Sequence, residues 1–214
     1  MTTTGQIIER GLRPMRDPDM TFFDPSELID WVNEAVNDIS IRQQLFTFEG
    51  TSTSTNGEID PPASPGEFVQ WRYIKDSTGF ELAWISEQAF GQMSVDEYAD
   101  TSSPLCAAYG LKVRILPAPD DGEVYTCGYW GLNAQLADEE DELPTPRTFD
   151  DKIVAYVQAQ CYAKLDDPDM YERKLAFYNF GLNDPKRSYS PRRPGQVPWG
   201  IEPGIFDLDT ERMH

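Results

Sequence analysis

The spacing of apolar residues changes twice along this chain of 214 residues. Apolar side chains recur every three to four positions before residue 43 and again after residue 147, which is the period of an α-helix buried on one face. Between residues 45 and 130 they alternate with polar residues and are interrupted by turn sequences, which is typical of strands. This order predicts an α+β fold, in which an antiparallel helical bundle carries an inserted antiparallel β domain.

The clearest local signal is the start of a helix at residue 25. Asp24 is a good N-cap, Pro25 fits the first helical position, and the Glu27 carboxylate is placed to reach back to the cap. The helix is predicted over residues 25–43. Its buried face is predicted to hold Leu28, Trp31, Val32, Ala35, Val36 and Ile39.

Three further long helices are predicted at the two ends of the chain. The first, over about 4–13, follows threonines that can cap it. The second follows Thr148, which we expect to be its cap, with Asp151 at the third position. The last ends near Phe180. The sequence Asp-Pro-Asp-Met occurs at 17–20 and at 167–170, and we interpret both copies as proline-marked helix starts.

The strand region is predicted to contain two hairpins. One pairs residues 68–74 with 80–85, and the other pairs 111–115 with 124–130 across a proline-rich turn. A short helix of one or two turns is predicted over 86–92.

The last thirty residues differ in composition from the rest. Five prolines and three glycines leave no helical or strand period after residue 185. We therefore predict three parts: a helical bundle from 1–45 and 147–184, an inserted β domain over 46–146, and an extended C-terminal arm over 185–214.

Charge separates the arm from the body. The whole chain has 18 basic and 37 acidic side chains and a net charge of -19, which argues against affinity for nucleic acid or anionic membranes. Residues 1–184 carry 13 basic and 33 acidic side chains, whereas residues 185–214 carry 5 and 4. The arm is predicted to bind a partner through basic residues and the apolar residues that follow them: Lys186, Arg187, Arg192, Arg193, Trp199, Ile205, Phe206 and Leu208.

Several kinds of enzyme lack the residues they need. The only histidine is His214, so no histidine-based triad or metal cluster is expected. Three widely spaced cysteines predict buried, reduced thiols without a zinc site, and phosphate-binding and dinucleotide-binding motifs are absent. We expect no cofactor. The chain has no apparent signal peptide or membrane span, which predicts synthesis in a cytoplasm and no membrane partner.

Two other function classes stay open. A carbohydrate-binding or tail-fibre module would use Trp71 or Trp84 as exposed sugar platforms. A small hydrolase would need a carboxylate beside an aromatic residue, as at Glu81 or Glu123. The acidic run 138–142 has no calcium-loop spacing and is predicted to be a solvated loop.

In content and order, these segments resemble the head-tail adaptor, or connector, proteins of tailed bacteriophages. The resemblance covers most of residues 4–180, without a counterpart for 46–104. It is carried by the helix at 24–35 followed by Arg42, the strands around Pro117-Ala118-Pro119 ending at Tyr129, Leu143-Pro144 before the helix at 149–156, and the helices to Phe180.

The resemblance implies a structural, non-enzymatic virion protein. Such adaptors form a ring, typically of twelve copies, beneath the portal, widen the DNA conduit and carry the tail. The implied partners are the portal, nozzle or tail-tube proteins, further copies of the chain, and DNA in transit without sequence-specific contact. By the same resemblance, the C-terminal arm reaches toward the portal.

Overall fold

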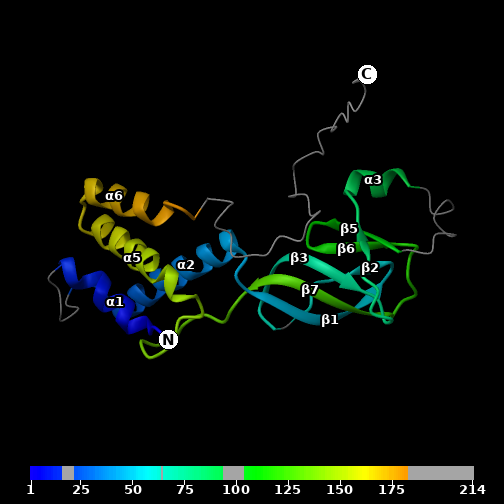
Figure 1. The fold of residues 1–214 in the computed structure, drawn as a ribbon, viewed down its shortest axis with the longest axis horizontal. Coiled ribbons are helices and arrows are strands. Elements are labelled where there is room, and N and C mark those ends of the chain that lie inside the picture. Colours follow the sequence, from blue (N-terminus) through cyan, green and yellow to red (C-terminus); the bar gives the residue numbers. More distant parts are fainter. Residues whose placement is uncertain (16–21, 64, 94–103, 183–214) are drawn as a thin grey trace, which may run out of the picture.

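A computed structural model describes residues 1–15, 22–63, 65–93 and 104–182. The molecule is elongated, with long helices at one end and a curled sheet at the other (Figure 1). The helical end consists of α1 (Thr4–Leu12), α2 (Pro25–Gln43), α5 (Asp150–Lys164) and α6 (Pro168–Asn179). Helices and strands in one chain confirm the predicted α+β class.

Most helices begin where the short-range signals predict. Asp24 caps α2 by accepting a hydrogen bond from the Ser26 backbone N–H at 2.9 Å. Asp167 caps α6 in the same way, from the Met170 N–H at 3.1 Å. The second Asp-Pro-Asp-Met sequence is therefore a helix start, as predicted, whereas the copy at 17–20 lies outside the described residues.

Two predicted caps are wrong in detail. The Glu27 carboxylate does not return to the cap of α2, but forms an ion pair with Lys164 at the end of α5. Thr148 does not cap α5, because residues Arg147–Phe149 form a 3-10 turn that leads directly into the helix. At α2 the ion pair replaces only the return of Glu27, since Asp24 still caps the helix, and at α5 the 3-10 turn replaces the predicted cap.

The helical end is built around α5, which packs against α6, α1 and α2. Gly11 on α1 permits a close approach, since a Cβ at this position would lie 3.0 Å from Val157 Cγ1. The largest fully buried aliphatic side chains of this core are Ile7, Ile8, Leu28, Val32, Ile39 and Ile153. The predicted apolar stripes on these helices thus face one common core. The antiparallel order of the complete bundle stays a prediction.

Seven strands form one sheet in the order β3-β7-β1-β2-β6-β5-β4. They are β1 (Thr47–Thr55), β2 (Glu58–Ile59), β3 (Glu67–Lys75), β4 (Ala83–Trp84), β5 (Leu105–Tyr109), β6 (Lys112–Leu116) and β7 (Val124–Leu132). The expected antiparallel β domain needs correction, because β4 pairs with β5 in parallel. A crossover that includes the predicted short helix, α3 (Glu87–Gln92), lies between these two strands, and parallel pairs require such a connection.

The first predicted hairpin is present only at its turn, and the second is wrong. β3 pairs with β7 along its length. Its contact with 80–85 is limited to an antiparallel Lys75–Glu81 bridge and to hydrogen bonds from the Asp76 N–H to the Phe80 carbonyl and from the Leu82 N–H to the Ile74 carbonyl. β6 pairs with β5 and β2, while β7 lies between β1 and β3. Alternation identifies strands correctly but does not specify partners, and here long-range partners replace the sequence neighbours.

The outer face of the sheet contains one close contact between neighbouring strands. The Tyr73 ring on β3 lies across Gly128 on β7, so that a Cβ at Gly128 would be 2.4 Å from ring carbons. The Tyr73 hydroxyl donates a hydrogen bond to the Glu49 carboxylate, and Lys75 Nζ lies 4.5 Å from the ring centroid. Gly128 therefore provides the space that this tyrosine occupies.

The three cysteines are buried thiols, as predicted. Cys106 and Cys127 lie in the apolar core of the sheet, and Cys161 lies among the helices. Burial raises the pKa of the Cys106 thiol and raises that of Cys127 to about 12. Both are therefore held as neutral thiols at neutral pH.

The predicted division of the chain into a bundle, an inserted β domain and an arm stays a prediction. Leu136 and Leu143, which lie within the 46–146 segment, are buried in the core of the helices. No helix among the described residues has both the length and the hydropathy of a membrane span.

Candidate functional site

All eight side chains predicted to form the binding arm lie outside the described residues: Lys186, Arg187, Arg192, Arg193, Trp199, Ile205, Phe206 and Leu208. The structure does describe the segment that leads to them. This segment ends at Leu182, which is 4% exposed and whose carbonyl accepts a hydrogen bond from the Gln43 side chain. The described chain therefore ends at a fixed point beside the last residue of α2.

A polar network holds the end of α6 against the end of α2. The Tyr178 hydroxyl donates to the Asp38 carboxylate at 2.5 Å, and Arg42 Nε donates to the same carboxylate at 2.8 Å. Arg42 also donates to the Asn179 side-chain oxygen at 2.9 Å. We call Asp38, Arg42, Gln43, Tyr178 and Asn179 the arm anchor. Burial and the hydrogen bond to Asp38 raise the pKa of Tyr178, so its phenol stays protonated as a donor.

A second tyrosine extends this network along α2. The Tyr156 hydroxyl donates to the Glu34 carboxylate at 2.9 Å, and its ring centroid lies 5.0 Å from that of Tyr178. Burial and the bond to Glu34 raise the pKa of Tyr156 to about 12. Several carboxylates of α2 are thus used within the subunit, to hold α5 and α6.

The arm anchor was not identified from the sequence. A weak signal is present, since Asp38 and Arg42 have the four-residue spacing of a helical ion pair. Tyr178 follows the three-to-four spacing of apolar residues after residue 147, and this spacing does not indicate that its hydroxyl has a partner on another helix. Tertiary packing is needed to place these groups together.

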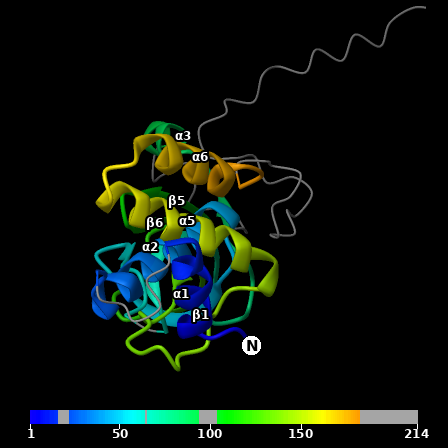
Figure 2. The ribbon, with the colours of Figure 1, turned by 90° about the vertical axis from the view of Figure 1, so that its left-hand side faces the viewer.

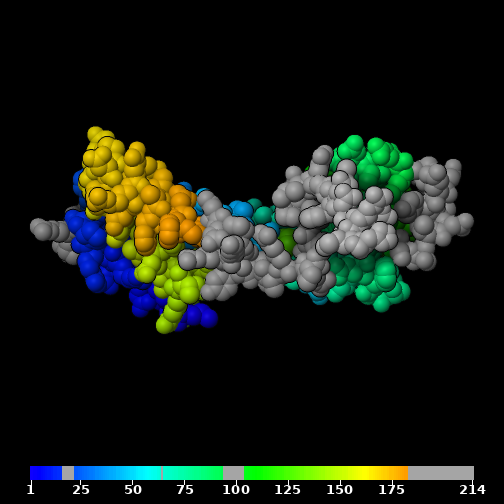
Figure 3. All heavy atoms as spheres, turned by 45° about the horizontal axis from the view of Figure 1, so that its top comes forward, coloured from blue at the N-terminus to red at the C-terminus, as the bar shows by residue number. Residues whose placement is uncertain are grey.

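The outer side of α6 exposes two aromatic side chains near its end. Phe177 is 51% exposed and Phe180 is 71% exposed. Lys152 Nζ lies 4.2 Å and 5.5 Å from the two ring centroids and donates a hydrogen bond to the Phe177 carbonyl. We call Phe177, Phe180 and Lys152 the aromatic ledge. In Figure 3 the residues of α6, yellow to orange, lie on the surface at the upper side of the helical end.

The acidic run 138–142 is a loop, as predicted, and it contacts the start of α1. The Thr4 N–H donates to the Asp141 carbonyl at 2.9 Å, and the Gly5 N–H donates to the Glu139 carbonyl at 2.8 Å. The Asp141 carboxylate accepts from the N–H groups of Ala137 and Asp138, which lower its pKa. The loop therefore has a defined conformation.

The positions of these side chains do not support the two alternative functions, a carbohydrate-binding module and a small hydrolase. Trp71 is 5% exposed, and its indole N–H donates to the Leu111 carbonyl at 2.8 Å, which contradicts its expected role as an exposed sugar platform. Trp84 is partly buried against the same core. Tyr125 beside Glu123 is also buried, and burial raises its pKa. These aromatic residues serve packing.

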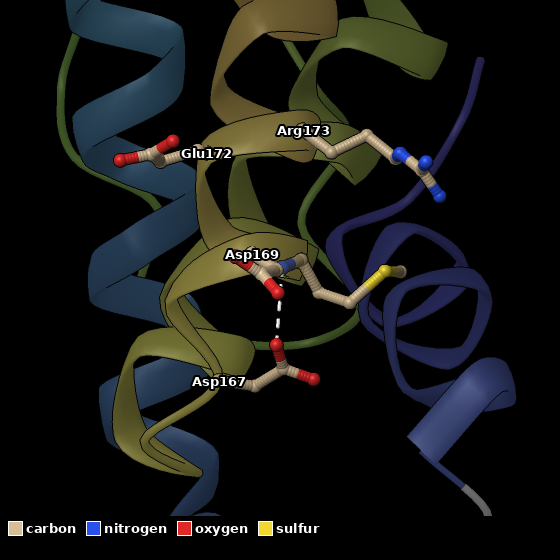
Figure 4. Close-up of a pocket in the computed structure, with 5 residues that line it drawn as sticks. Asp167, Asp169, Glu172 and Arg173 are labelled. Carbon is tan, nitrogen blue, oxygen red and sulfur yellow. Dashed lines mark hydrogen bonds between the residues drawn. The ribbon is translucent and has the colours of Figure 1, made fainter.

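An open hollow lies at the start of α6, lined by Asp167, Asp169, Met170, Glu172 and Arg173 (Figure 4). The Asp167 carboxylate caps the helix there, as its hydrogen bond to the Met170 N–H shows. In the described part of the chain, no group of three or more histidine, cysteine, aspartate or glutamate residues is arranged to hold a metal ion.

Comparison with known proteins gives one family. Residues 2–197 match the model of the family described as SU10 adaptor protein. The matched region includes every described helix and strand and the four predicted basic residues of the arm. The chain matches no curated protein.

Proposed function

Because the chain belongs to the SU10 adaptor protein family, a family of phage head-tail adaptors, we propose that its copies form a ring beneath the portal. The family establishes a structural role in a phage and agrees with the resemblance drawn from the sequence. The proposal adds that the ring holds twelve copies, extends the DNA channel and carries the tail proteins.

The extent of the family match carries the proposal. It continues past α6 to residue 197, so the basic cluster from Lys186 to Arg193 belongs to the matched sequence. We infer that this cluster pairs with acidic surface on the portal. The apolar residues Trp199, Ile205, Phe206 and Leu208 lie beyond the match and would fill grooves on the same partner.

The arm anchor gives this arm a defined starting point. Leu182 is buried and tied to Gln43, so an arm that begins there has a fixed position relative to α2. The thirty residues after 184 span on the order of 100 Å when extended, at about 3.3 Å per residue. That length is sufficient to reach a neighbouring virion component.

The charge of the body suits a DNA conduit. A net charge of -19 per copy repels DNA phosphates, so the genome would pass through such a ring without binding to its wall. The same charge makes copies repel each other. Stable ring contacts must therefore come from apolar packing and local charge complementarity.

Truncation after Asn183 tests the role of the arm. The shortened protein keeps the arm anchor and should unfold at the temperature of the full chain, yet fail to add density beneath the portal in negative-stain images. A full-length control with Lys186, Arg187, Arg192 and Arg193 changed to glutamine separates charge from length. Docking of the truncated protein at full-chain affinity would refute the assignment.

A further inference from the structure

The helical end has different chemistry on its two opposite sides. Figures 1 and 2 both show α6 at the top of this end and the N-terminus at the bottom. The acidic loop 138–142 lies beside the N-terminus, because Glu142 bridges to Thr3. Since α5 packs on both α6 and α1, it lies between the two sides. The aromatic ledge and the acidic loop are therefore on opposite flanks of one subunit.

The aromatic ledge has the composition of a contact surface. Two adjacent phenyl rings are half or more exposed, and exposed aromatic pairs are enriched where proteins bind one another. The Lys152 ammonium beside them adds a positive charge to a chain in which acids outnumber bases two to one. The ledge is thus an apolar surface with a cationic edge, and it suits an acidic partner surface.

The acidic loop provides such a surface on the other flank. Asp138, Glu140 and Glu142 are exposed. The loop backbone is held by the N–H groups of Thr4 and Gly5, so the main chain that carries these carboxylates needs little ordering on binding. Its negative charge is therefore available to a cation on another molecule.

We propose that the aromatic ledge of one copy packs against the acidic loop of the next copy. The inference rests on the proposed ring and assigns its contact surfaces. A ring requires two different, complementary patches on separate sides of the subunit, because a patch that binds itself gives only a pair. The two flanks meet this requirement, and the contact sets Lys152 against carboxylates in subunits that otherwise repel.

The charge of the ledge favours a second copy over the arm as its occupant. The arm begins with a basic cluster at 186–193, and this cluster would meet the Lys152 ammonium with like charge. The body of another copy offers acid instead. Occupation of the ledge by the arm is therefore the competing outcome in the experiment.

Paired cysteines test the contact directly. A variant with both Phe180→Cys and Glu140→Cys places one thiol on each flank of the subunit. Oxidation should link copies in succession and give a ladder of species beyond the dimer on a non-reducing gel. The native cysteines are buried and should not react. Each single variant should stop at the dimer, and Phe180→Cys with Thr51→Cys, on the exposed face of β1, is the matched control.

A charge exchange provides a second measurement. Glu140→Lys should weaken association roughly tenfold or more, and adding Lys152→Glu to it should restore association by recreating the pair in reverse. Equal weakening by the single and double variants would overturn the contact.

Sedimentation velocity, with and without portal, separates this inference from the ring itself. Oligomers without a cysteine ladder would overturn the assigned surfaces but leave the ring intact. A monomer under both conditions would overturn both ideas, while portal docking is still tested by the arm truncation. A link between Phe180→Cys and a Trp199→Cys thiol, without the ladder, would assign the ledge to the arm.

Discussion

Replacement of Gly128 by alanine should destabilise the sheet because of one neighbour, Tyr73. The new Cβ would lie 2.4 Å from the ring carbons, so the ring must move away. Overpacking of this kind costs about 1–3 kcal/mol. Loss of the hydrogen bond to Glu49 adds about 0.5–1.5 kcal/mol, and the better strand preference of alanine returns about 0.5–1 kcal/mol. We expect Gly128→Ala to lower the free energy of unfolding by roughly 2 kcal/mol.

The effect of Gly128→Ala on the free energy of unfolding should change sign when the Tyr73 ring is absent. In a Tyr73→Ala background the three atoms nearest to this Cβ are gone, so Gly128→Ala should be neutral or stabilise by about 0.5–1 kcal/mol. Urea unfolding followed by tryptophan fluorescence gives the four free energies of this cycle. An equal destabilisation by Gly128→Ala in both backgrounds would refute the reasoning, since the cost would then not come from the tyrosine.

Three further outcomes are expected. Gly11→Leu should lower the free energy of unfolding by about 2 kcal/mol, measured in urea, because its side chain would overlap Val157. Tyr156 has a pKa raised to about 12, so its contribution to stability is complete below pH 10 and disappears as the pH rises through 12; Tyr156→Phe should flatten this part of the thermal-melting profile. Cys106 and Cys127 should react with a thiol reagent at pH 8 only after unfolding in guanidinium.

The helices were predictable because their signals are local. Asp24 and Pro25 identify the start of α2, and the three-and-four spacing gives its buried face. The cap of α5 was mispredicted because Thr148 falls inside a 3-10 turn, which the same local residues also permit. Helix boundaries are therefore set mainly by neighbours in sequence, and their fine detail by tertiary contacts.

The local sequence predicts the strands of the sheet but not how they pair. Residues of β7 alternate as a strand should, but the strand lies between β3 and β1, and its partners on β1 are more than seventy residues earlier in the chain. The hairpin prediction assigned it to β6 because they are consecutive. Pairing depends on which surfaces the whole fold buries, and single-segment periodicity carries no such information.

The candidate site also has one part that the sequence predicts and two parts that it does not. The arm was predicted from its composition, and its eight named residues lie outside the described structure. The arm anchor depends on a hydrogen bond between Tyr178 and Asp38, which lie on different helices and 140 residues apart in sequence. No local pattern indicates this contact. The aromatic ledge was missed because exposure of Phe177 and Phe180 depends on how α6 packs on α5.

The position of the arm anchor has a mechanical consequence. Gln43 is the last residue of α2, and β1 begins at Thr47, so the segment joining helices to sheet starts at the residue that holds Leu182. Tension on the chain beyond Leu182 would therefore be applied to this joint, instead of peeling α6 away from its free end. A load on one arm would be shared by the helical and sheet halves of its subunit.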